Sequence, residues 1–148
     1  AGLTGMQFAR GSDVELLRRA RDLTGTPPVL LNAADPANPY GSVLPWPEGE
    51  RLARLPSNYL VLDGGLPVLG VEGYGRRLLP LAPLTEDGLA RALAALPDLL
   101  RVRRAARPAR RIEVRQWADM PIQQSPAAGP LRALGFEPAP RGMVYYGP

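Results

Sequence analysis

The chain has 148 residues and a net charge of +4, and all 18 of its basic residues are arginines. The length fits one domain spanning residues 1–148, and a hydrophobic fraction of 45% is sufficient for a core. Because the sequence contains neither cysteine nor histidine, it excludes a Cys/His zinc site, a cysteine nucleophile, a Ser-His-Asp triad and histidine acid–base chemistry.

The N-terminal part is predicted to be an extended lead-in over 2–10 followed by one helix and one strand. Ser12 and Glu15 have the spacing of a capping box, which predicts an amphipathic helix over 13–23. The apolar run over 28–31 predicts a short strand.

A proline-rich loop with two aromatic residues follows. Asp35 and Asn38 both precede proline, which favours extended backbone, and their side chains can cap neighbouring amides. Tyr40 and Trp46 are therefore held on a stiff segment. One interpretation is a stacking platform for single-stranded bases, at about 1–3 kcal/mol per base. The other is a structural loop that plugs one end of a barrel.

The middle of the chain is predicted to be a β-meander and a helix. Strands over 59–62 and 66–71 are joined by an Asp-Gly turn, and a third strand covers 77–81. Thr85 is expected to cap a helix that ends near Leu96.

The last part alternates strands and helix. Residues 111–117 alternate as a half-exposed strand, with Gln116 on the face opposite Trp117. A helix is expected from Ser125 to Gly135, and a final strand over 143–146. The order indicates an α+β fold, a small curved mixed sheet or β-barrel-like module with about three peripheral helices.

The basic residues concentrate at the C-terminal end. Residues 1–98 hold nine arginines and eleven acids, whereas residues 99–148 hold nine arginines and three acids. The densest run comprises Arg101, Arg103, Arg104, Arg107, Arg110, Arg111 and Arg115. Such a run indicates either a patch that follows a phosphate backbone or a solvated surface in an arginine-biased proteome.

No complete catalytic motif is present in the sequence. The glycines at 64–65 and 73–75 lack the spacing of phosphate-binding loops, and there is no Walker A motif. Asp35 is expected to cap its own loop. We therefore expect no catalytic residue, no metal and no cofactor in this segment. No signal peptide and no apolar stretch near the ~18 residues of a membrane span is present, which favours a cytoplasmic protein without membrane contact.

Several segments, in order, resemble the Lhr (large helicase-related) family of superfamily 2 helicases. The most specific is the run Ala-Asp-Pro-Ala-Asn-Pro-Tyr-Gly over 34–41 with Leu-Pro-Trp-Pro over 44–47. Weaker, collinear matches are the segments 5–9, 60–64, 75–79 and 134–142. The sequence departs from the family pattern at 72–75, where Glu-Gly-Tyr-Gly stands in place of Glu-Arg-Gly-Gly.

The resemblance implies a fragment of a much larger helicase, as does a chain that begins with Ala1 rather than methionine. ATP and magnesium would be bound by the motor, which moves 3′ to 5′ on single-stranded DNA and unwinds RNA–DNA hybrids. The implied partners are single-stranded DNA or an RNA–DNA hybrid, and the remaining helicase domains. The C-terminal half of the family is also similar to a DNA glycosylase family.

Three hypotheses remain open from the sequence. The first is a non-catalytic accessory domain of a DNA-repair helicase that contacts nucleic acid. The second is a glycosylase-like module in which a carboxylate such as Asp35 assists base removal. The third is an oligomerisation module that forms a homo-oligomer through the aromatic loop.

Overall fold

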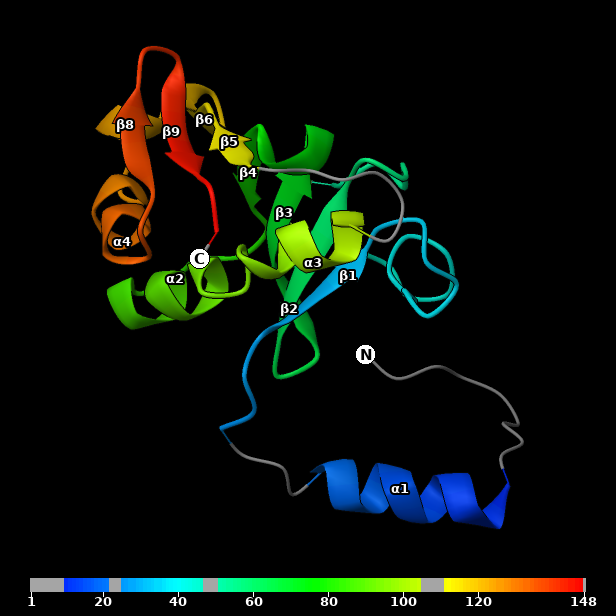
Figure 1. The fold of residues 1–148 in the computed structure, drawn as a ribbon. Helices are drawn as coiled ribbons and strands as arrows, with labels where there is room; N and C mark the ends of the chain where they lie inside the picture. Colours follow the sequence, from blue (N-terminus) through cyan, green and yellow to red (C-terminus); the bar gives the residue numbers. More distant parts are fainter. Residues whose placement is uncertain (1–9, 22–24, 47–50, 105–110, 148) are drawn as a thin grey trace.

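The computed structural model describes residues 10–21, 25–46, 51–104 and 111–147, which form two β-sheets with helices packed around them (Figure 1). The larger sheet contains β1 (Val29–Asn32), β2 (Tyr59–Asp63), β3 (Leu66–Glu72), β4 (Arg77–Pro80), β6 (Gln116–Trp117) and β7 (Met120–Pro121), paired in that order. Neighbouring strands of this sheet run antiparallel, except for β4 and β6, which run parallel. The smaller sheet is antiparallel with the order β5 (Ile112–Val114), β9 (Gly142–Tyr145), β8 (Glu137–Ala139).

The predicted hairpin is confirmed, and its turn depends on two glycines. Gly64 and Gly65 adopt φ angles of 58° and 81° between β2 and β3. These values lie in the left-handed region that residues with a side chain rarely adopt. A two-residue turn with positive φ matches the twist of the strands that it joins.

In the part of the chain that the structure describes, four α-helices and two short 3₁₀ helices accompany the sheets. They are α1 (Gly11–Arg21), η1 (Gly73–Gly75), α2 (Glu86–Leu93), α3 (Asp98–Arg104), η2 (Ile122–Gln124) and α4 (Ala128–Ala133). Thr85 caps α2 as predicted, since its hydroxyl accepts a hydrogen bond from the Gly88 amide at 3.1 Å. The helix ends at Leu93 rather than Leu96, although Leu96 is still fully buried.

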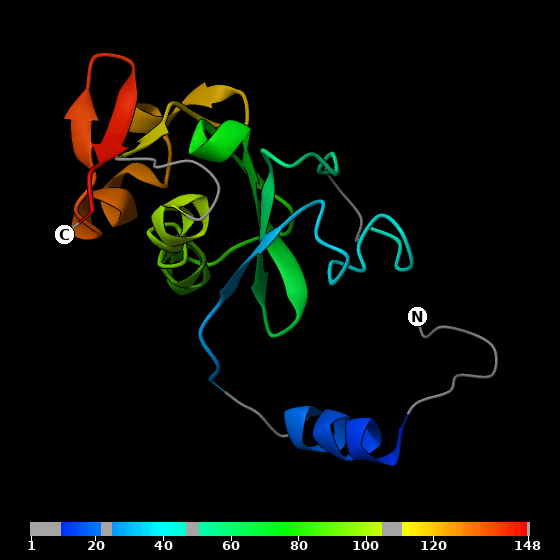
Figure 2. The same cartoon turned by 45° about the vertical axis from the view of Figure 1, so that its right-hand side comes forward.

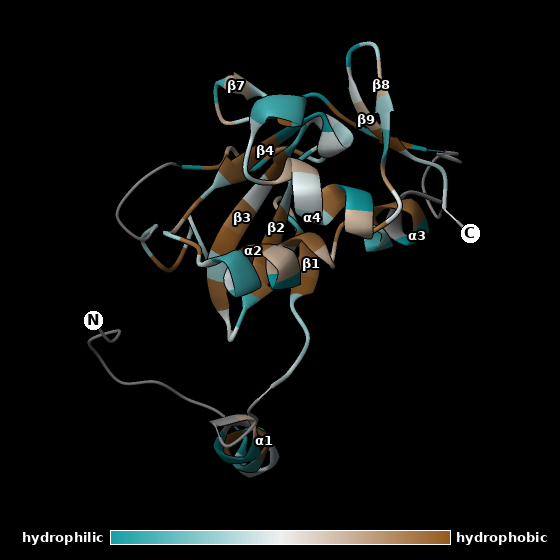
Figure 3. Cartoon of the chain, turned by 90° about the vertical axis from the view of Figure 1, so that its left-hand side faces the viewer, coloured by the Kyte–Doolittle hydropathy of each residue, from teal (hydrophilic) through white to brown (hydrophobic). Residues whose placement is uncertain are grey.

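The main core lies between the larger sheet, the smaller sheet and the helices. Val61, Leu69 and Leu78 of the larger sheet are buried against Leu93 of α2 and Leu99 of α3. Hydrophobic residues gather on β2, β3 and β4 accordingly (Figure 3). Within the described ranges, no helix is long and apolar enough to cross a membrane.

The aromatic loop covers the opposite face of the larger sheet. Leu60 of β2 and Leu79 of β4 form a second buried cluster with Ala33 and Leu52, and Trp46 packs against it. Figure 2 shows the cyan loop and the yellow-green helices on opposite sides of the sheet. Successive side chains of a strand point to opposite faces of the sheet. Leu60 and Leu79 therefore lie on the face away from the main core, and the aromatic loop covers them.

The mixed α+β class is confirmed, but the barrel alternative is wrong. The larger sheet stays open, with β1 and β7 as its two edges. It does not close because the chain leaves it for a separate small sheet, in which β5 pairs with β9. The aromatic loop consequently covers a sheet face and does not plug a barrel end.

Two local predictions near the N-terminus and at 111–117 also need correction. α1 begins at Gly11, because the amides of Asp13 and Val14 already donate to the Arg10 carbonyl, so Ser12 lies in the first turn and does not cap it. The predicted end of this helix, 22–23, and the lead-in before Arg10 lie outside the described residues.

The alternation predicted for 111–117 breaks at Arg115. The amides of Arg115 and Gln116 both donate to the Arg76 carbonyl, where the chain passes from the small sheet to the large one. This change of sheet resets the alternation, so that Trp117 is buried and Gln116 is exposed.

The β2–β3 turn is tied to α2 by an ion pair, which makes its contribution to stability depend on pH. Arg91 donates to both carboxylate oxygens of Asp63, at 2.8 and 3.2 Å. These hydrogen bonds lower the pKa of Asp63 below its ordinary value. The contribution is therefore present above the ordinary carboxyl pKa of about 4 and is lost as the pH falls through the lowered value.

We expect Asp63→Asn to lower the free energy of unfolding at neutral pH, because the amide cannot pair as a charge with Arg91. The difference from the unsubstituted protein should disappear in strong acid, where Asp63 is protonated in both states. Urea unfolding at about pH 7 and about pH 2.5 measures it. A difference of equal size at both values would contradict the assignment.

Candidate nucleic-acid interface

The seven arginines of the 101–115 run are only partly described. Arg103 and Arg104 belong to α3, but their side chains lie outside the description, and Arg107 and Arg110 fall in 105–110, which is also outside it. The other three each pair with a carboxylate: Arg101 with Asp98 at 3.2 Å, Arg111 with Glu113 at 3.8 Å and Arg115 with Glu113 at 2.8 Å. A continuous patch of seven remains a prediction.

β5 brings two of these arginines to one outward face. Ile112 and Val114 are fully buried in the core. Since successive strand residues point to opposite sides, Arg111, Glu113 and Arg115 face away from it. The half-exposed strand predicted here is thus confirmed over 112–114.

β9 and the β8–β9 turn complete this surface. Val144 lies opposite Glu113 in the antiparallel register. Tyr146 follows β9 with its side chain 58% exposed, and Arg141 lies exposed in the turn before it. We call the surface formed by these residues the β5–β9 face; its members are Arg111, Glu113, Arg115, Arg141, Val144 and Tyr146.

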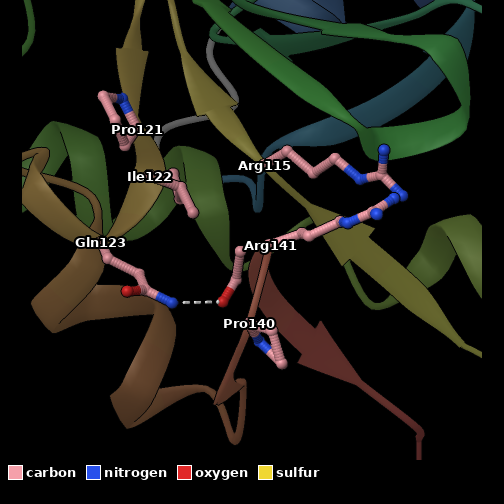
Figure 4. A pocket seen from close by; sticks show the side chains of 7 residues that line it. Arg115, Pro121, Ile122, Gln123, Pro140 and Arg141 are labelled. Atoms are coloured by element: carbon pink, nitrogen blue, oxygen red, sulfur yellow. Dashed lines mark hydrogen bonds between the residues drawn. The ribbon is translucent and has the colours of Figure 1, made fainter.

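Two adjoining hollows open on the β5–β9 face and share Pro140 and Arg141. The larger, of about 340 Å³, is lined by Arg111, Glu113, Ala139, Pro140, Arg141, Val144 and Tyr146. The smaller, of about 170 Å³, is lined by Arg115, Pro121, Ile122, Gln123, Pro140, Arg141 and Gly142. Figure 4 shows the side chains of Arg115 and Arg141, which both line the smaller one, extending to the same side.

Gln123 holds the β8–β9 turn in position beneath the two arginines. Its side-chain amide donates to the carbonyls of Ala139 and Gly142, each at 2.8 Å. The bond to Gly142 is drawn in Figure 4. Because Arg141 lies between these two acceptors, its backbone is fixed at the rim of the hollow.

The β5–β9 face is electrostatically unbalanced. Glu113 accepts from Nε of Arg115 at 2.8 Å, and this bond, with the charges of Arg115, Arg111 and Arg76, lowers the pKa of Glu113. Arg141 makes no hydrogen bond or ion pair with any described residue. Glu137 of β8 lies opposite Val144 of β9 and lines neither hollow. The β5–β9 face therefore carries three arginines, Arg111, Arg115 and Arg141, and one acid, Glu113.

The aromatic loop is built differently from the predicted stacking platform. Tyr40 is only 7% exposed, burial raises the pKa of its hydroxyl, and this hydroxyl donates to the Gly65 carbonyl at 2.8 Å. In this conformation the ring of Tyr40 offers no open face to a base. Trp46 is half-buried, with its ring centre 6.1 Å from that of Tyr40. A stacking role for Trp46 stays a prediction.

The predicted Asx caps are confirmed, and an arginine that sequence reasoning missed clamps the loop. Asp35 and Asn38 accept from the amides of Ala37 and Tyr40, at 2.8 and 3.0 Å. The guanidinium of Arg54 donates to the carbonyls of three loop residues, Asp35, Asn38 and Tyr40. Arg54 lies in a segment without regular structure, so no periodic signal marked it.

The acidic residues in the described ranges form no metal-binding group, and Asp35 takes part in a loop cap. No group of three or more Asp and Glu residues in the described ranges is arranged to hold a metal ion. The Asp35 carboxylate caps its own loop, in agreement with its predicted role.

Arg141 and Tyr146 were not identified as site residues from the sequence. Arg141 is isolated between Pro140 and Gly142, far along the chain from the arginine run, and Tyr146 follows the similar Tyr145. The alternation of side chains along a strand is the signal that could have shown which of the two tyrosines faces outward. Tyr145 stacks on Phe136 with ring centres 5.0 Å apart, which leaves Tyr146 on the outward face.

Comparison with known proteins shows the family. No protein-family model matches the chain. The chain is 31% identical over 149 aligned residues to the Lhr helicase/uracil glycosylase of Escherichia coli K12, covering 96% of this chain and 9% of that protein. It is 38% identical over 106 residues to the Lhr helicase/probable uracil glycosylase of Mycolicibacterium smegmatis, covering 66% of this chain and 7% of that protein. The chain thus spans less than a tenth of the length of these relatives. It belongs to the Lhr helicase family and matches a C-terminal segment of it.

Proposed function

We propose that this chain is a non-catalytic accessory module that contacts nucleic acid for an ATP-dependent helicase, through the β5–β9 face. The observation that carries the proposal is the excess of arginine there, with Arg141 unpaired among the described residues. Guanidinium groups bind phosphate oxygens in pairs of hydrogen bonds, and phosphate contacts supply most of the sequence-independent affinity for nucleic acid.

The motor of the proposed helicase would lie elsewhere in a longer protein. Its ATP and magnesium would be bound there, and the remaining helicase domains would be the partners of this module. We infer that residues 1–148 act as one unit of a cytoplasmic DNA-repair helicase that moves 3′ to 5′. The names of the two relatives, both of which contain the word helicase, support the helicase part of this inference.

Charge reversal at Arg141 tests the proposal. Arg141→Glu should weaken binding of the full chain to a fluorescent oligonucleotide about tenfold and lower the salt slope of log affinity by about one. The fold should be unaffected, since Arg141 supports no described contact. Arg132→Glu is the matched control, because Arg132 is also exposed, lies on α4 and lines neither hollow.

The opposite change on the same face should strengthen binding. Glu113→Gln removes the carboxylate that holds Arg115 and leaves that guanidinium to a phosphate. If Arg141→Glu and Arg132→Glu weaken binding equally, only net charge matters and the assignment to the β5–β9 face is wrong. If the chain shows no salt-dependent binding, nucleic-acid contact itself is wrong.

A second candidate is base excision, because both relatives are named as known or probable uracil glycosylases. The full chain would then release uracil from a uracil-containing oligonucleotide. If a carboxylate of the aromatic loop performs the chemistry, Asp35→Asn should abolish the release. Asp35 is occupied as a cap in this structure, which favours the non-catalytic module.

A further inference from the structure

Tyr146 is an exposed aromatic ring at the edge of a cationic hollow. Its side chain is 58% exposed and lines the larger hollow together with Arg111, Arg141 and the buried Val144. It makes no hydrogen bond or ring contact with a described residue. An exposed tyrosine between arginines offers a flat apolar surface where a polyanion is attracted.

Arg115 and Arg141 form a paired cation site in the adjoining hollow. Their side chains extend to the same side from different places in the chain, Arg115 just after β5 and Arg141 in the β8–β9 turn (Figure 4). Glu113 engages Nε of Arg115, and the terminal nitrogens of Arg115 make no hydrogen bond with a described residue. Two guanidiniums that line one hollow can be bridged by an anion with several oxygens, such as a phosphate diester.

We propose that the two hollows bind one unpaired nucleotide of single-stranded DNA, with its phosphate between Arg115 and Arg141 and its base stacked on Tyr146. This rests on the proposed function and names its ligand. The hollows share Pro140 and Arg141, so neighbouring parts of one strand can occupy them together. A base inside a duplex is already stacked on both sides, so the site selects an unpaired strand.

The test separates the contribution of the base from that of the phosphate. Fluorescence anisotropy of the full chain is measured with oligo-dT, with an abasic oligonucleotide of equal length and with a duplex. Tyr146→Ala should weaken oligo-dT binding about tenfold and leave the abasic strand unchanged, because only the former can stack. Tyr146→Phe is the matched variant, since it keeps the ring and should keep the affinity.

Oligo-rU carries the same phosphate and a similar flat base, so a further arm with it distinguishes RNA from DNA as the source of the strand. Stronger binding of oligo-rU than of oligo-dT would overturn the assignment to DNA. Salt-dependent binding that is equal for oligo-dT, the abasic strand and the duplex, and unaffected by Tyr146→Ala, would overturn the stacking site and leave the proposed function standing. No salt-dependent binding of any strand would overturn both.

Discussion

Asn38→Ala is expected to lower the free energy of unfolding by about 3 kcal/mol, because it leaves two backbone groups in a buried place without partners. The Asn38 side chain is fully buried. Its amide donates to the Ala33 carbonyl at 2.9 Å, and its oxygen accepts from the Tyr40 amide at 3.0 Å. Alanine can replace neither bond, and Ala33 is itself fully buried, so water cannot reach its carbonyl without opening the loop.

A matched control is Asn32, the last residue of β1. Its amide donates to the Pro56 carbonyl and its oxygen accepts from the Ala34 amide, both at 2.9 Å, in the same pattern as Asn38. Asn32 is half-buried, so water can replace its bonds, and Asn32→Ala should cost only about 1 kcal/mol. Urea unfolding measures both variants. Equal losses would mean that burial of Asn38 does not determine its contribution.

Gly142→Ala is expected to destabilise the small sheet and to weaken nucleic-acid binding at the same time. A β-carbon at Gly142 would overlap the Val114 carbonyl and approach Cα of Arg115 at 3.0 Å. Backbone cannot give way as a flexible side chain can, so we expect a loss of about 3 kcal/mol or more. β9 would have to move away from β5, and this would separate Arg141 from Arg115.

Gly129→Ala is a suitable comparison for Gly142→Ala. Gly129 lies in α4, where an added β-carbon would meet no atom within 4 Å, so alanine should be tolerated or slightly stabilising. Thermal unfolding measures the stability of both variants, and anisotropy with oligo-dT measures their binding. If Gly142→Ala were as stable as the unsubstituted protein, the backbone of Gly142 could not lie as close to Val114 and Arg115 as described.

Much of the local structure was predictable because its causes lie within a few residues. The two-residue turn between β2 and β3 needs positive φ, and adjacent glycines supply it. Thr85, Asp35 and Asn38 cap amides two or three residues away. Gly135, with a φ of 89°, follows the C-terminal end of α4 as expected.

The candidate site was predictable only in part. The arginine run pointed to Arg111 and Arg115, and β5 does present both on one face. The same counting of charges could not show that Glu113 neutralises part of that face, nor that Arg115 and Arg141 line one hollow. Those facts depend on the pairing of β5 with β9, which no local pattern specifies.

The sequence by itself determined the family likeness, the absence of Cys and His chemistry, and the local turns and caps. Tertiary structure decided the rest. It left the large sheet open and placed β5, β8 and β9 in a second sheet, and it buried Tyr40, which the sequence had offered as a stacking surface. It also placed Arg54 on carbonyls 14 to 19 residues away and Tyr146 beside two arginines. The physical reason is that caps and turns depend on nearby φ and ψ angles, whereas sheet partners and burial depend on the packing of the whole core.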